Sequence, residues 1–385
     1  MQTRASAPGQ RRTSIWPRYD AAVTGFRDYW YPATWSRAVG RKPVSLQMLD
    51  EQIVLIRENG RVHALFDQCP HRGIPLSVGR QEFAGTWTCR YHGWTFDLQT
   101  GVLKAALTDG PDSPICGKVR VRTYPVEERF GVIWIYMGDG QPPPLEADIP
   151  SEFLAPDTVI LGRISMQKGN WRYACENAQD EGHAKYLHRY GTIATLFRLM
   201  PAWSTVKVIP DTEGWISRET KSISYTEEYG ELGPWPPKLW WKRRTRGSRI
   251  SMRLPCILRN HYVGTLKNKF AWHVPVGADH YRYVQFYVVN GVRGLAKLKE
   301  YAYFWTWFRW VQLVQFNGQD TWMVELMPET PPERLYRPDV SITAWRKLCE
   351  HARGAAPEAP PLAEELARLA EEQPEAAVDE LAPRR

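Results

Sequence analysis

The chain has 385 residues, of which 43% are hydrophobic and 24% charged, so it can bury two or three cores as an ordinary globular protein does. No run of about 18 uncharged residues occurs, and the first 18 residues hold four arginines without an apolar stretch, so we expect neither a transmembrane helix nor a signal peptide. The six cysteines lack the spacing of a disulfide framework, which predicts a cytoplasmic protein.

Charge is unevenly distributed along the chain. The net charge is +8, yet residues 356–385 hold eight acids and three bases among many Ala and Pro residues. This composition predicts a flexible acidic tail over residues 353–385, with one short helix at 362–369. The positive charge elsewhere suits an acidic protein partner, and no nucleic-acid-binding motif accompanies it.

The first part of the chain predicts a polar arm and then a β-rich domain. The flexible arm is expected over residues 1–25 and the β-rich domain over residues 26–150. Asn59-Gly60, between two apolar segments, is a strong signal for a β-hairpin. Three consecutive prolines at 142–144 mark the end of this domain. Its strands are expected at residues 52–56, 61–66, 94–98 and 131–137.

Two loops of this domain each carry a cysteine and a histidine, in the pattern C-x-H-x17-C-x-x-H. The pattern suits either a tetrahedral zinc site or a Rieske [2Fe–2S] cluster, in which two thiolates hold one iron and two imidazoles the other. Zinc knuckles usually separate the first pair of ligands by two or more residues, whereas only Pro70 intervenes here, so the spacing favours the Rieske cluster. The residues concerned are Cys69, His71, Cys89 and His92, while Cys116, Cys175, Cys256 and Cys349 are expected to be buried free thiols.

A second group of candidate ligands lies at residues 176–188, with the pattern E-N-x-x-D-x-x-H-x-x-x-x-H. Asp180 and His183 are three apart and would share one face of a helix. His183 and His188 would be about 140° apart on an ideal helix, too wide for one metal ion. We therefore expect the helix to bulge or end between them, as Gly182 would permit. The alternative is an exposed amphipathic helix with two incidental histidines.

Residues 151–352 are expected to form a second domain that contains both strands and helices. Its antiparallel strands are expected at 205–209, 216–225, 250–254, 270–274 and 281–289, and a helix at 301–316. The aromatic residues 301–310 are more typical of a core than of a cofactor site. The basic, Trp-rich segment 234–246 is a solvated loop, a lid over a pocket, a ferredoxin contact or a membrane-surface patch.

The two motifs together resemble those of the α subunit of Rieske non-heme iron ring-hydroxylating oxygenases, over about residues 25–348. Within this family the chain is most similar to the terminal oxygenases of the carbazole 1,9a-dioxygenase type. The resemblance implies an α+β protein, with an all-β Rieske domain and a catalytic domain whose helices cover an antiparallel sheet. It also implies a homotrimer that receives electrons from a ferredoxin and an NAD(P)H-dependent reductase.

The resemblance also assigns roles to individual residues. Asp180 is expected to bridge the electron path by accepting hydrogen bonds from His183 and from His92 of a neighbouring subunit, and Asn177 is the other expected catalytic residue. Cys69, His71, Cys89 and His92 would hold the cluster, and His183, His188 and Asp320 a ferrous ion. As an alternative, Asp320 would only cap a helix. The substrate pocket is expected to include Ala178, Ala184, Phe316 and Asn317.

The expected function is O₂-dependent hydroxylation, in particular dihydroxylation, of a hydrophobic polycyclic aromatic or heteroaromatic substrate. One rival is a Rieske electron carrier without oxygenase chemistry. It would leave four residues unexplained, namely Asp180, His183, His188 and Asp320. Another is a monooxygenase or demethylase of a steroid or terpenoid, which would use the same iron ligands. Contact with a membrane surface is conceivable for a very hydrophobic substrate but is not expected.

Overall fold

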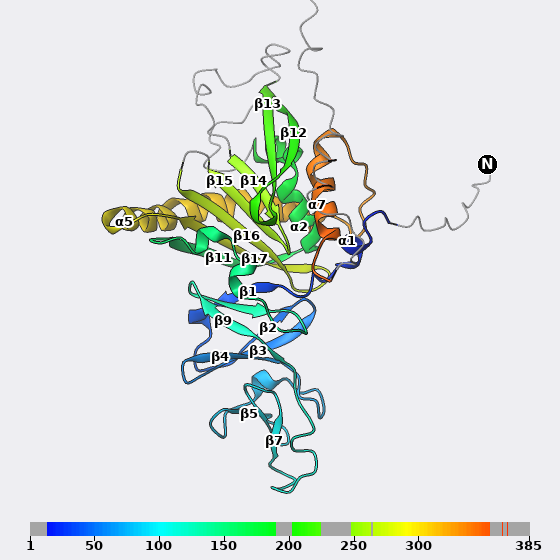
Figure 1. Ribbon diagram of the computed structural model, residues 1–385, viewed down its shortest axis with the longest axis vertical. Helices are drawn as coiled ribbons and strands as arrows, with labels where there is room; N and C mark the ends of the chain where they lie inside the picture. The colour runs from blue at the N-terminus through cyan, green and yellow to red at the C-terminus, as the bar shows by residue number, and fades with distance from the viewer. Residues whose placement is uncertain are drawn as a thin grey trace, which may run out of the picture.

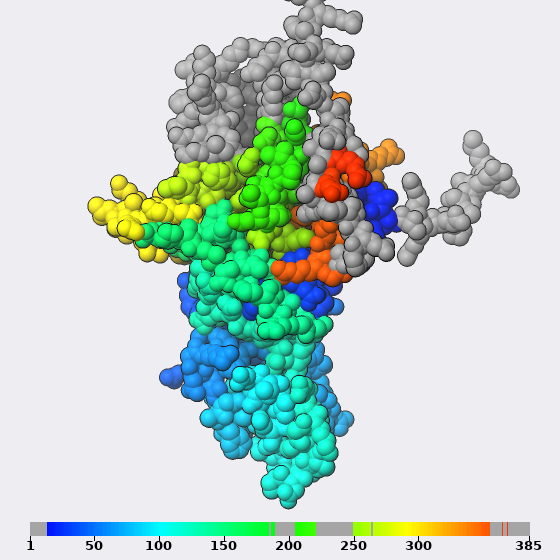
Figure 2. All heavy atoms as spheres, viewed as in Figure 1, coloured from blue at the N-terminus to red at the C-terminus, as the bar shows by residue number. Residues whose placement is uncertain are grey.

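The computed structural model describes residues 14–189, 202–224, 248–262 and 265–354, and in addition residues 364 and 368. The molecule is elongated, with three small β-sheets in its narrow half and one large sheet with helices in its wide half (Figure 1). Figure 2 shows the same outline with all atoms drawn. The predicted α+β architecture, with an all-β part first and a mixed part after it, is confirmed.

A seven-stranded antiparallel sheet forms the centre of the wide half. Five of its strands coincide with predicted ones, whereas β11 and β15 are additional. β15 buries only its first two side chains, whereas β16 and β17 are buried along almost their whole length. In their order across the sheet, the strands are β11 (Val159–Lys168), β17 (His280–Val289), β16 (Lys267–Pro275), β15 (Ile257–Tyr262), β14 (Ser248–Arg253), β13 (Ile216–Ser224) and β12 (Ala202–Pro210).

The two faces of this sheet have different surroundings, because successive side chains of a strand point to opposite sides. Phe270 and Trp272 of β16 face the narrow half, and the rings of Trp272 and Trp134 lie 5.6 Å apart. Buried residues of both halves thus belong to one apolar core. Each buried aromatic side chain in it stabilises the fold by about 1.5–3 kcal/mol. Lys269 and His273, on the opposite face of β16, line a cavity that lies between the sheet and the helices.

Helices and short 3₁₀ segments complete the wide half. They are α1 (Pro17–Ala21), η4 (Ser151–Phe153), α2 (Trp171–Gln179), α3 (Glu181–Tyr186), η5 (Leu187–Arg189), η7 (Thr212–Gly214), α5 (Gly294–Tyr303), η9 (Phe304–Phe316), α6 (Asn317–Leu326), η10 (Arg337–Asp339) and α7 (Val340–Glu350). Among the residues that the structure describes, every helix is too short or too polar to cross a membrane.

The expected helix 301–316 belongs to a longer helical run in which α5, η9 and α6 follow one another without a break. Its aromatic residues do not all enter a core, which corrects the expectation. Phe304 and Phe308 are buried against Tyr287 of β17, but Trp305 and Trp310 are 48% and 51% exposed. η9 has the wider π-helical geometry, so the spacing of its buried residues departs from the α-helical period. In Figure 2, α5 (yellow) projects from the side of the molecule.

The narrow half consists of three antiparallel sheets. The predicted hairpin is present, and Asn59 and Gly60 have φ angles of 47° and 80°, as a type I′ turn requires. The sheets are β1 (Trp30–Trp35), β10 (Val132–Tyr136) and β9 (Val126–Arg129); β2 (Val44–Met48), β3 (Glu51–Glu58), β4 (Arg61–Phe66) and β8 (Thr123–Tyr124); and β5 (Thr86–Thr88), β6 (Trp94–Asp97) and β7 (Leu103–Ala106). Three further 3₁₀ turns are η1 (Ser36–Ala38), η2 (Leu76–Val78) and η3 (Leu145–Ala147).

Both ends of the described segment 14–354 make contacts with the rest of the molecule. In α1, which falls within the expected arm, Tyr19 is buried and its backbone N–H donates to Glu350 of α7. Arg353, at the start of the expected tail, forms a salt bridge with Asp148. Of the expected helix 362–369, residues 364 and 368 are described and both are helical, while segment 234–246 lies outside the described residues.

Candidate metal centres

The chain changes direction at Asp180, which ends α2 and begins α3. Its backbone is extended (φ −66°, ψ 123°), and its carboxylate accepts hydrogen bonds from the N–H groups of Gly182 and His183. Asp180 and His183 are therefore neighbours through helix capping and not through a shared helix face, which corrects the expectation. The expected change before His188 occurs at Leu187, where α3 passes into η5. Gly182 does not lie at this change of helix. It allows close packing against Tyr336, because a Cβ at this position would lie 2.5 Å from the hydroxyl of Tyr336.

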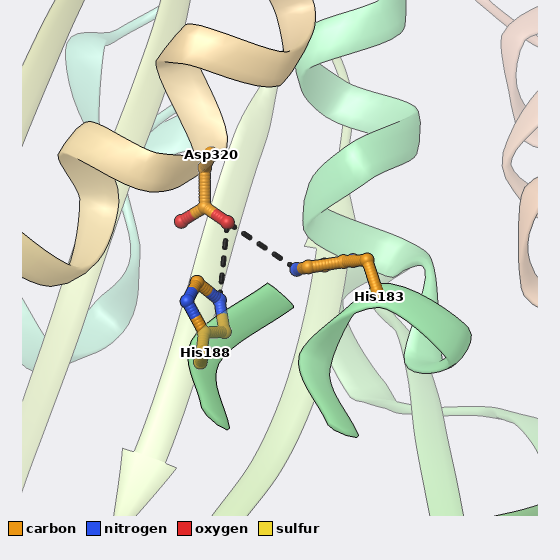
Figure 3. A group of neighbouring side chains, drawn as sticks. All are labelled: His183, His188 and Asp320. Atoms are coloured by element: carbon orange, nitrogen blue, oxygen red, sulfur yellow. Dashed lines mark ion pairs between the residues drawn. The ribbon is translucent and has the colours of Figure 1, made fainter. Parts of the chain in front are cut away.

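Three side chains from separate elements meet between the sheet and the helices: His183 of α3, His188 of η5 and Asp320 of α6 (Figure 3). Nε2 of His183 lies 3.3 Å, and Nε2 of His188 3.1 Å, from the same oxygen, Oδ1 of Asp320. Two ligands at right angles, each about 2.1 Å from an octahedral ion, would lie about 3 Å apart, so the spacing fits one shared ion. Two imidazoles and one carboxylate on one side of an ion are typical of non-heme ferrous oxygenases.

The second nitrogen of each imidazole lies near a side-chain oxygen. Nδ1 of His188 lies 2.8 Å from Oε1 of Gln319, and Nδ1 of His183 lies 3.3 Å from Oδ2 of Asp180. An N–H on each Nδ1 leaves each Nε2 with the lone pair that a metal ion needs. The side-chain amide of Asn317 donates to Oδ2 of Asp320 over 3.1 Å and so orients this carboxylate. Sequence reasoning missed Gln319, although its position next to Asp320 was a usable signal.

The electrostatics of this group favour a cation. Burial disfavours a charge on His183, but the adjacent carboxylates of Asp180 and Asp320 outweigh it and raise the pKa of His183 to about 9. Burial alone would raise the pKa of Asp320, but the two imidazoles lower it more strongly. The pKa of Asp320 therefore lies well below its usual range. Oδ1 of Asp320 is buried without a well-directed hydrogen bond. The side chain of Asp320 does not cap α6, so the alternative that it is only a helix cap is not supported. The donor set and its charge therefore fit a ferrous ion.

A cavity of about 980 Å³ opens beside these three residues. The predicted pocket residues all line it, from α2 (Ala178), α3 (Ala184) and the junction of η9 and α6 (Phe316, Asn317). Asn177 of α2, predicted as a catalytic residue, lines it as well. The ring of Phe316 stacks on His188 with centroids 3.6 Å apart. The sheet contributes residues that the sequence did not single out, namely Arg218, Ile250, Leu258, Asn260, Lys269, His273, Tyr281 and Tyr283.

The four candidate cluster ligands lie together at the narrow end. Cys69 and Cys89 are buried free thiols, while His71 is exposed and His92 half-buried. The two imidazole rings lie 4.6 Å apart, and His71 stacks on Trp94 at 4.7 Å. Buried sulfurs and outward imidazoles are what a Rieske cluster requires, because its histidines pass electrons outward.

The surroundings of Cys69 suit a thiolate that is bound by a cation. Burial raises the pKa of the Cys69 thiol to about 11, whereas the backbone N–H groups of His71 and Arg72 point to its sulfur and favour the anion. Such a thiol ionises when a metal binds it. Of the other cysteines, Cys175, Cys256 and Cys349 are buried free thiols as predicted, while Cys116 is only half-buried, which corrects the expectation.

Comparisons with known proteins agree with this arrangement. Residues 29–125 match the family model of the Rieske [2Fe-2S] domain, and residues 136–196 match the model described as a homotrimeric ring hydroxylase. The carbazole 1,9a-dioxygenase terminal oxygenase component CarAa of Metapseudomonas resinovorans is 31% identical over 383 residues, which cover 89% of this chain and 95% of that protein. The chain belongs to the Rieske non-heme iron ring-hydroxylating oxygenases. The predicted family and enzyme class are therefore confirmed.

Solved structures place this oxygenase in the same group. The oxygenase in the reduced complex between oxygenase and ferredoxin of carbazole 1,9a-dioxygenase has a TM-score of 0.75 and 31% identity, over 88% of this chain and 93% of that one. The terminal oxygenase from Nocardioides aromaticivorans IC177 also has a TM-score of 0.75, with 29% identity, over 88% and 98% of the two chains. This oxygenase is thus a terminal oxygenase of the ring-hydroxylating type, whose cofactors are a Rieske [2Fe–2S] cluster and a mononuclear iron.

Proposed function

We propose that this oxygenase hydroxylates a polycyclic aromatic or heteroaromatic substrate, adding both atoms of O₂, with electrons supplied by a ferredoxin and an NAD(P)H-dependent reductase. The observation that carries the proposal is the convergence of His183, His188 and Asp320 on the wall of a cavity of about 980 Å³. A cavity of this size accommodates a ligand of two or three fused rings. The ferredoxin complexes of the solved relatives and the homotrimeric family model support a ferredoxin donor and a homotrimer.

The residues proposed for the two metal sites have separate tasks. His183, His188 and Asp320 would hold the mononuclear iron, and Cys69, His71, Cys89 and His92 would hold the cluster. When bound, the cluster supplies single electrons and the iron supplies activation of O₂. Asp180 and Gln319 fix the orientation of the two imidazoles, and Asn317 fixes the carboxylate.

Apolar side chains on several elements are proposed to hold the substrate ring. Ala178 and Ala184 are small and leave room beside His183, while Phe316 presents an aromatic ring. Ile250 and Leu258 add an apolar patch on the sheet. Contacts of this kind orient a flat ring and displace water from the reaction site.

The proposed domain division follows the two metal sites. Residues 26–150 form the Rieske domain and residues 151–352 the catalytic domain, with residues 1–25 and 353–385 as the arm and the tail. The six cysteines are all free, which supports a reducing compartment such as the cytoplasm.

Product analysis tests the proposed function. We expect the purified oxygenase, combined with ferredoxin, reductase and NADH under labelled O₂, to convert at least one member of an aromatic panel into a diol that carries two labelled oxygens. Asp320→Ala is expected to lose the product and the mononuclear iron but to keep the cluster spectrum, because the ligand set would be incomplete. Asp279→Ala removes an exposed carboxylate and serves as the matched control.

Three results would contradict this proposal in whole or in part. Normal product from Asp320→Ala would show that the iron site is elsewhere. A protein that accepts electrons into its cluster but forms no oxygenated product from any panel member would be an electron carrier. A product with one labelled oxygen would correct the proposed dihydroxylation to monooxygenation.

A further inference from the structure

The sheet side of the cavity has a polar patch that an unsubstituted aromatic ring would not match. Lys269 of β16 and Asn260 of β15 are directly paired across the two strands, and both side chains line the cavity. Lys269 is only 4% exposed, so its ammonium group has little access to bulk water. A buried ammonium group requires a partner that compensates for its lost hydration.

Lys269 has only a neutral partner within hydrogen-bonding distance in the described part of the chain. Its Nζ donates to Oδ1 of Asn317 over 2.7 Å, and this oxygen also accepts a hydrogen bond from Gln285. An ammonium group has three N–H donors, so this contact leaves two of them for another acceptor. Burial lowers the pKa of Lys269 to about 8, while Asp320, the acid that acts on it, favours the charge. An anionic group beside Nζ would favour the charged form of Lys269 further.

The other charged pairs on this wall do not offer an acceptor to Lys269. Arg218 and Glu181 form a buried salt bridge at 2.9 Å, and Arg249 pairs with Glu219 at 3.2 Å. Among the described residues, no carboxylate lies within salt-bridge distance of Lys269. The charge of Lys269 adds to that of a ferrous ion at the neighbouring site, so the cavity favours an anion.

Asn260 supplies a second unsatisfied group at the same place. Its Oδ1 is buried without a hydrogen-bond partner. The oxygen and nitrogen of a side-chain amide have nearly the same shape, so rotation of the group by 180° places its NH₂ donors where Oδ1 lies. The patch formed by Lys269 and Asn260 thus offers donors to one ligand from two adjacent strands.

On the basis of the proposed function, we infer that the substrate is an aromatic acid, whose carboxylate accepts hydrogen bonds from Nζ of Lys269 and from the side-chain amide of Asn260. The ring of this acid lies against the apolar side of the cavity, at Phe316 and Ala178. A neutral hydrocarbon of the same shape would displace water from Lys269. The ammonium group would then have a single hydrogen-bond acceptor, Oδ1 of Asn317. The patch therefore selects for the acid over the hydrocarbon.

A binding comparison tests this inference. The probes are naphthalene-2-carboxylate and 2-acetylnaphthalene, which have nearly the same shape but differ in charge. We expect the holoenzyme at neutral pH to bind the acid more tightly than the ketone, on the order of tenfold or more, by isothermal titration calorimetry. Lys269→Met is expected to remove this preference and to leave the affinity for the ketone unchanged or higher.

Two further variants keep the test decisive. Lys269→Gln keeps a donor toward Asn317 without the charge, so it serves if Lys269→Met does not fold, and it is also expected to lose the preference. Lys168→Met removes a lysine from the surface, where it pairs with Glu325, and is expected to behave as the wild type. The cluster spectrum and the iron content of every variant are measured alongside.

Three outcomes would overturn the inference: no binding of the acid, an equal or stronger affinity of the wild type for the ketone, or an equal loss of both ligands in the variants. The last result would show that Lys269 only supports Asn317. These failures differ from a failure of the proposed function. In that case, neither probe nor any other aromatic compound would yield an oxygenated product, whatever their relative affinities.

Discussion

His273 shows how the cavity wall alters a single residue. It is 3% exposed, stacks on Tyr283 with ring centroids 4.8 Å apart, and its Nδ1 lies 3.5 Å from the sulfur of Cys175. Burial, and next the charge of Lys269, lower the pKa of His273 from 6.5 to about 3. The folded protein therefore holds His273 neutral at a pH where the unfolded chain binds a proton there.

The lowered pKa of His273 predicts that the protein loses stability at acid pH and that His273 accounts for part of this loss. Above pH 6.5, His273 is neutral in both the folded and the unfolded state. As the pH falls from 6.5 toward about 3, only the unfolded state gains the proton, so the free energy of unfolding decreases. Between pH 6.5 and about pH 5, the free energy of unfolding of the wild type should fall by about 2 kcal/mol more than that of His273→Phe, which keeps the ring. Urea unfolding at several pH values measures the difference. Parallel pH profiles of the two proteins would contradict the prediction.

At the scale of elements, α2 is fixed on the side that faces away from the iron site. Glu176 belongs to the same motif as the candidate ligands, yet it accepts hydrogen bonds from Arg346 of α7 and Tyr19 of α1. Arg346 also pairs with Glu333 at 2.5 Å. Because Asp180 ends α2, this buried network sets the position from which α3 and His183 begin.

The network predicts a large effect of Arg346→Met. The substitution would leave Glu176 buried without its cation, and we expect it to lower the free energy of unfolding by about 3–5 kcal/mol. The mononuclear iron content should fall as well, because α2 would shift, whereas the cluster spectrum should persist. Arg334→Met, at an exposed position, is the matched control. Thermal unfolding measures the change in stability, and metal analysis measures the iron content. Equal Tm values for the two variants would show that the network does not stabilise the fold.

At the scale of the whole molecule, the two candidate metal sites belong to different halves. The loops with the cluster residues follow β4 and β5 in the narrow half. α2 and α3 lie in the wide half, well separated from these loops along the long axis (Figure 1). Electron tunnelling slows steeply with distance. In the proposed homotrimer, a ring of head-to-tail contacts would place the cluster of one subunit beside the iron site of the next.

Asp180 is the residue proposed to carry that contact. Its carboxylate accepts hydrogen bonds from two backbone N–H groups and lies 3.3 Å from Nδ1 of His183, which leaves one lone pair for a partner subunit. Asp180→Asn should still cap α3, because Asn is as good a cap as Asp, but it loses the charge and gains an NH₂ group. We expect both metals to be retained, while the electron reaches the iron at least tenfold more slowly.

Single turnover measures this step. The cluster is reduced beforehand, substrate and O₂ are added, and cluster reoxidation is followed together with product. Asp279→Asn is the control for the change of charge at an exposed site. Reoxidation of the Asp180→Asn cluster at the wild-type rate with full product yield would rule out this bridge.

The sequence by itself determined the features that depend on local spacing. The positions of Cys69, His71, Cys89 and His92 in two short loops indicated the cluster, because such loops place their ligands within a few residues of a turn. The motif around His183 and five strands of the wide half were equally readable, because a ligand pair within one segment and a run of strand-forming residues are properties of the local chain.

The tertiary structure alone decided which distant residues meet. Sequence spacing placed Asp180 on a common helix face, but the chain instead ends one helix and begins another there. Alternation along β16 puts Lys269 and His273 on one side and Trp272 on the other, yet it cannot tell which side the helices cover. The packing of α2, α3 and α6 over one face of the sheet settles that question. The strand register pairs Lys269 with Asn260 on this face, so both line the cavity beside the iron ligands.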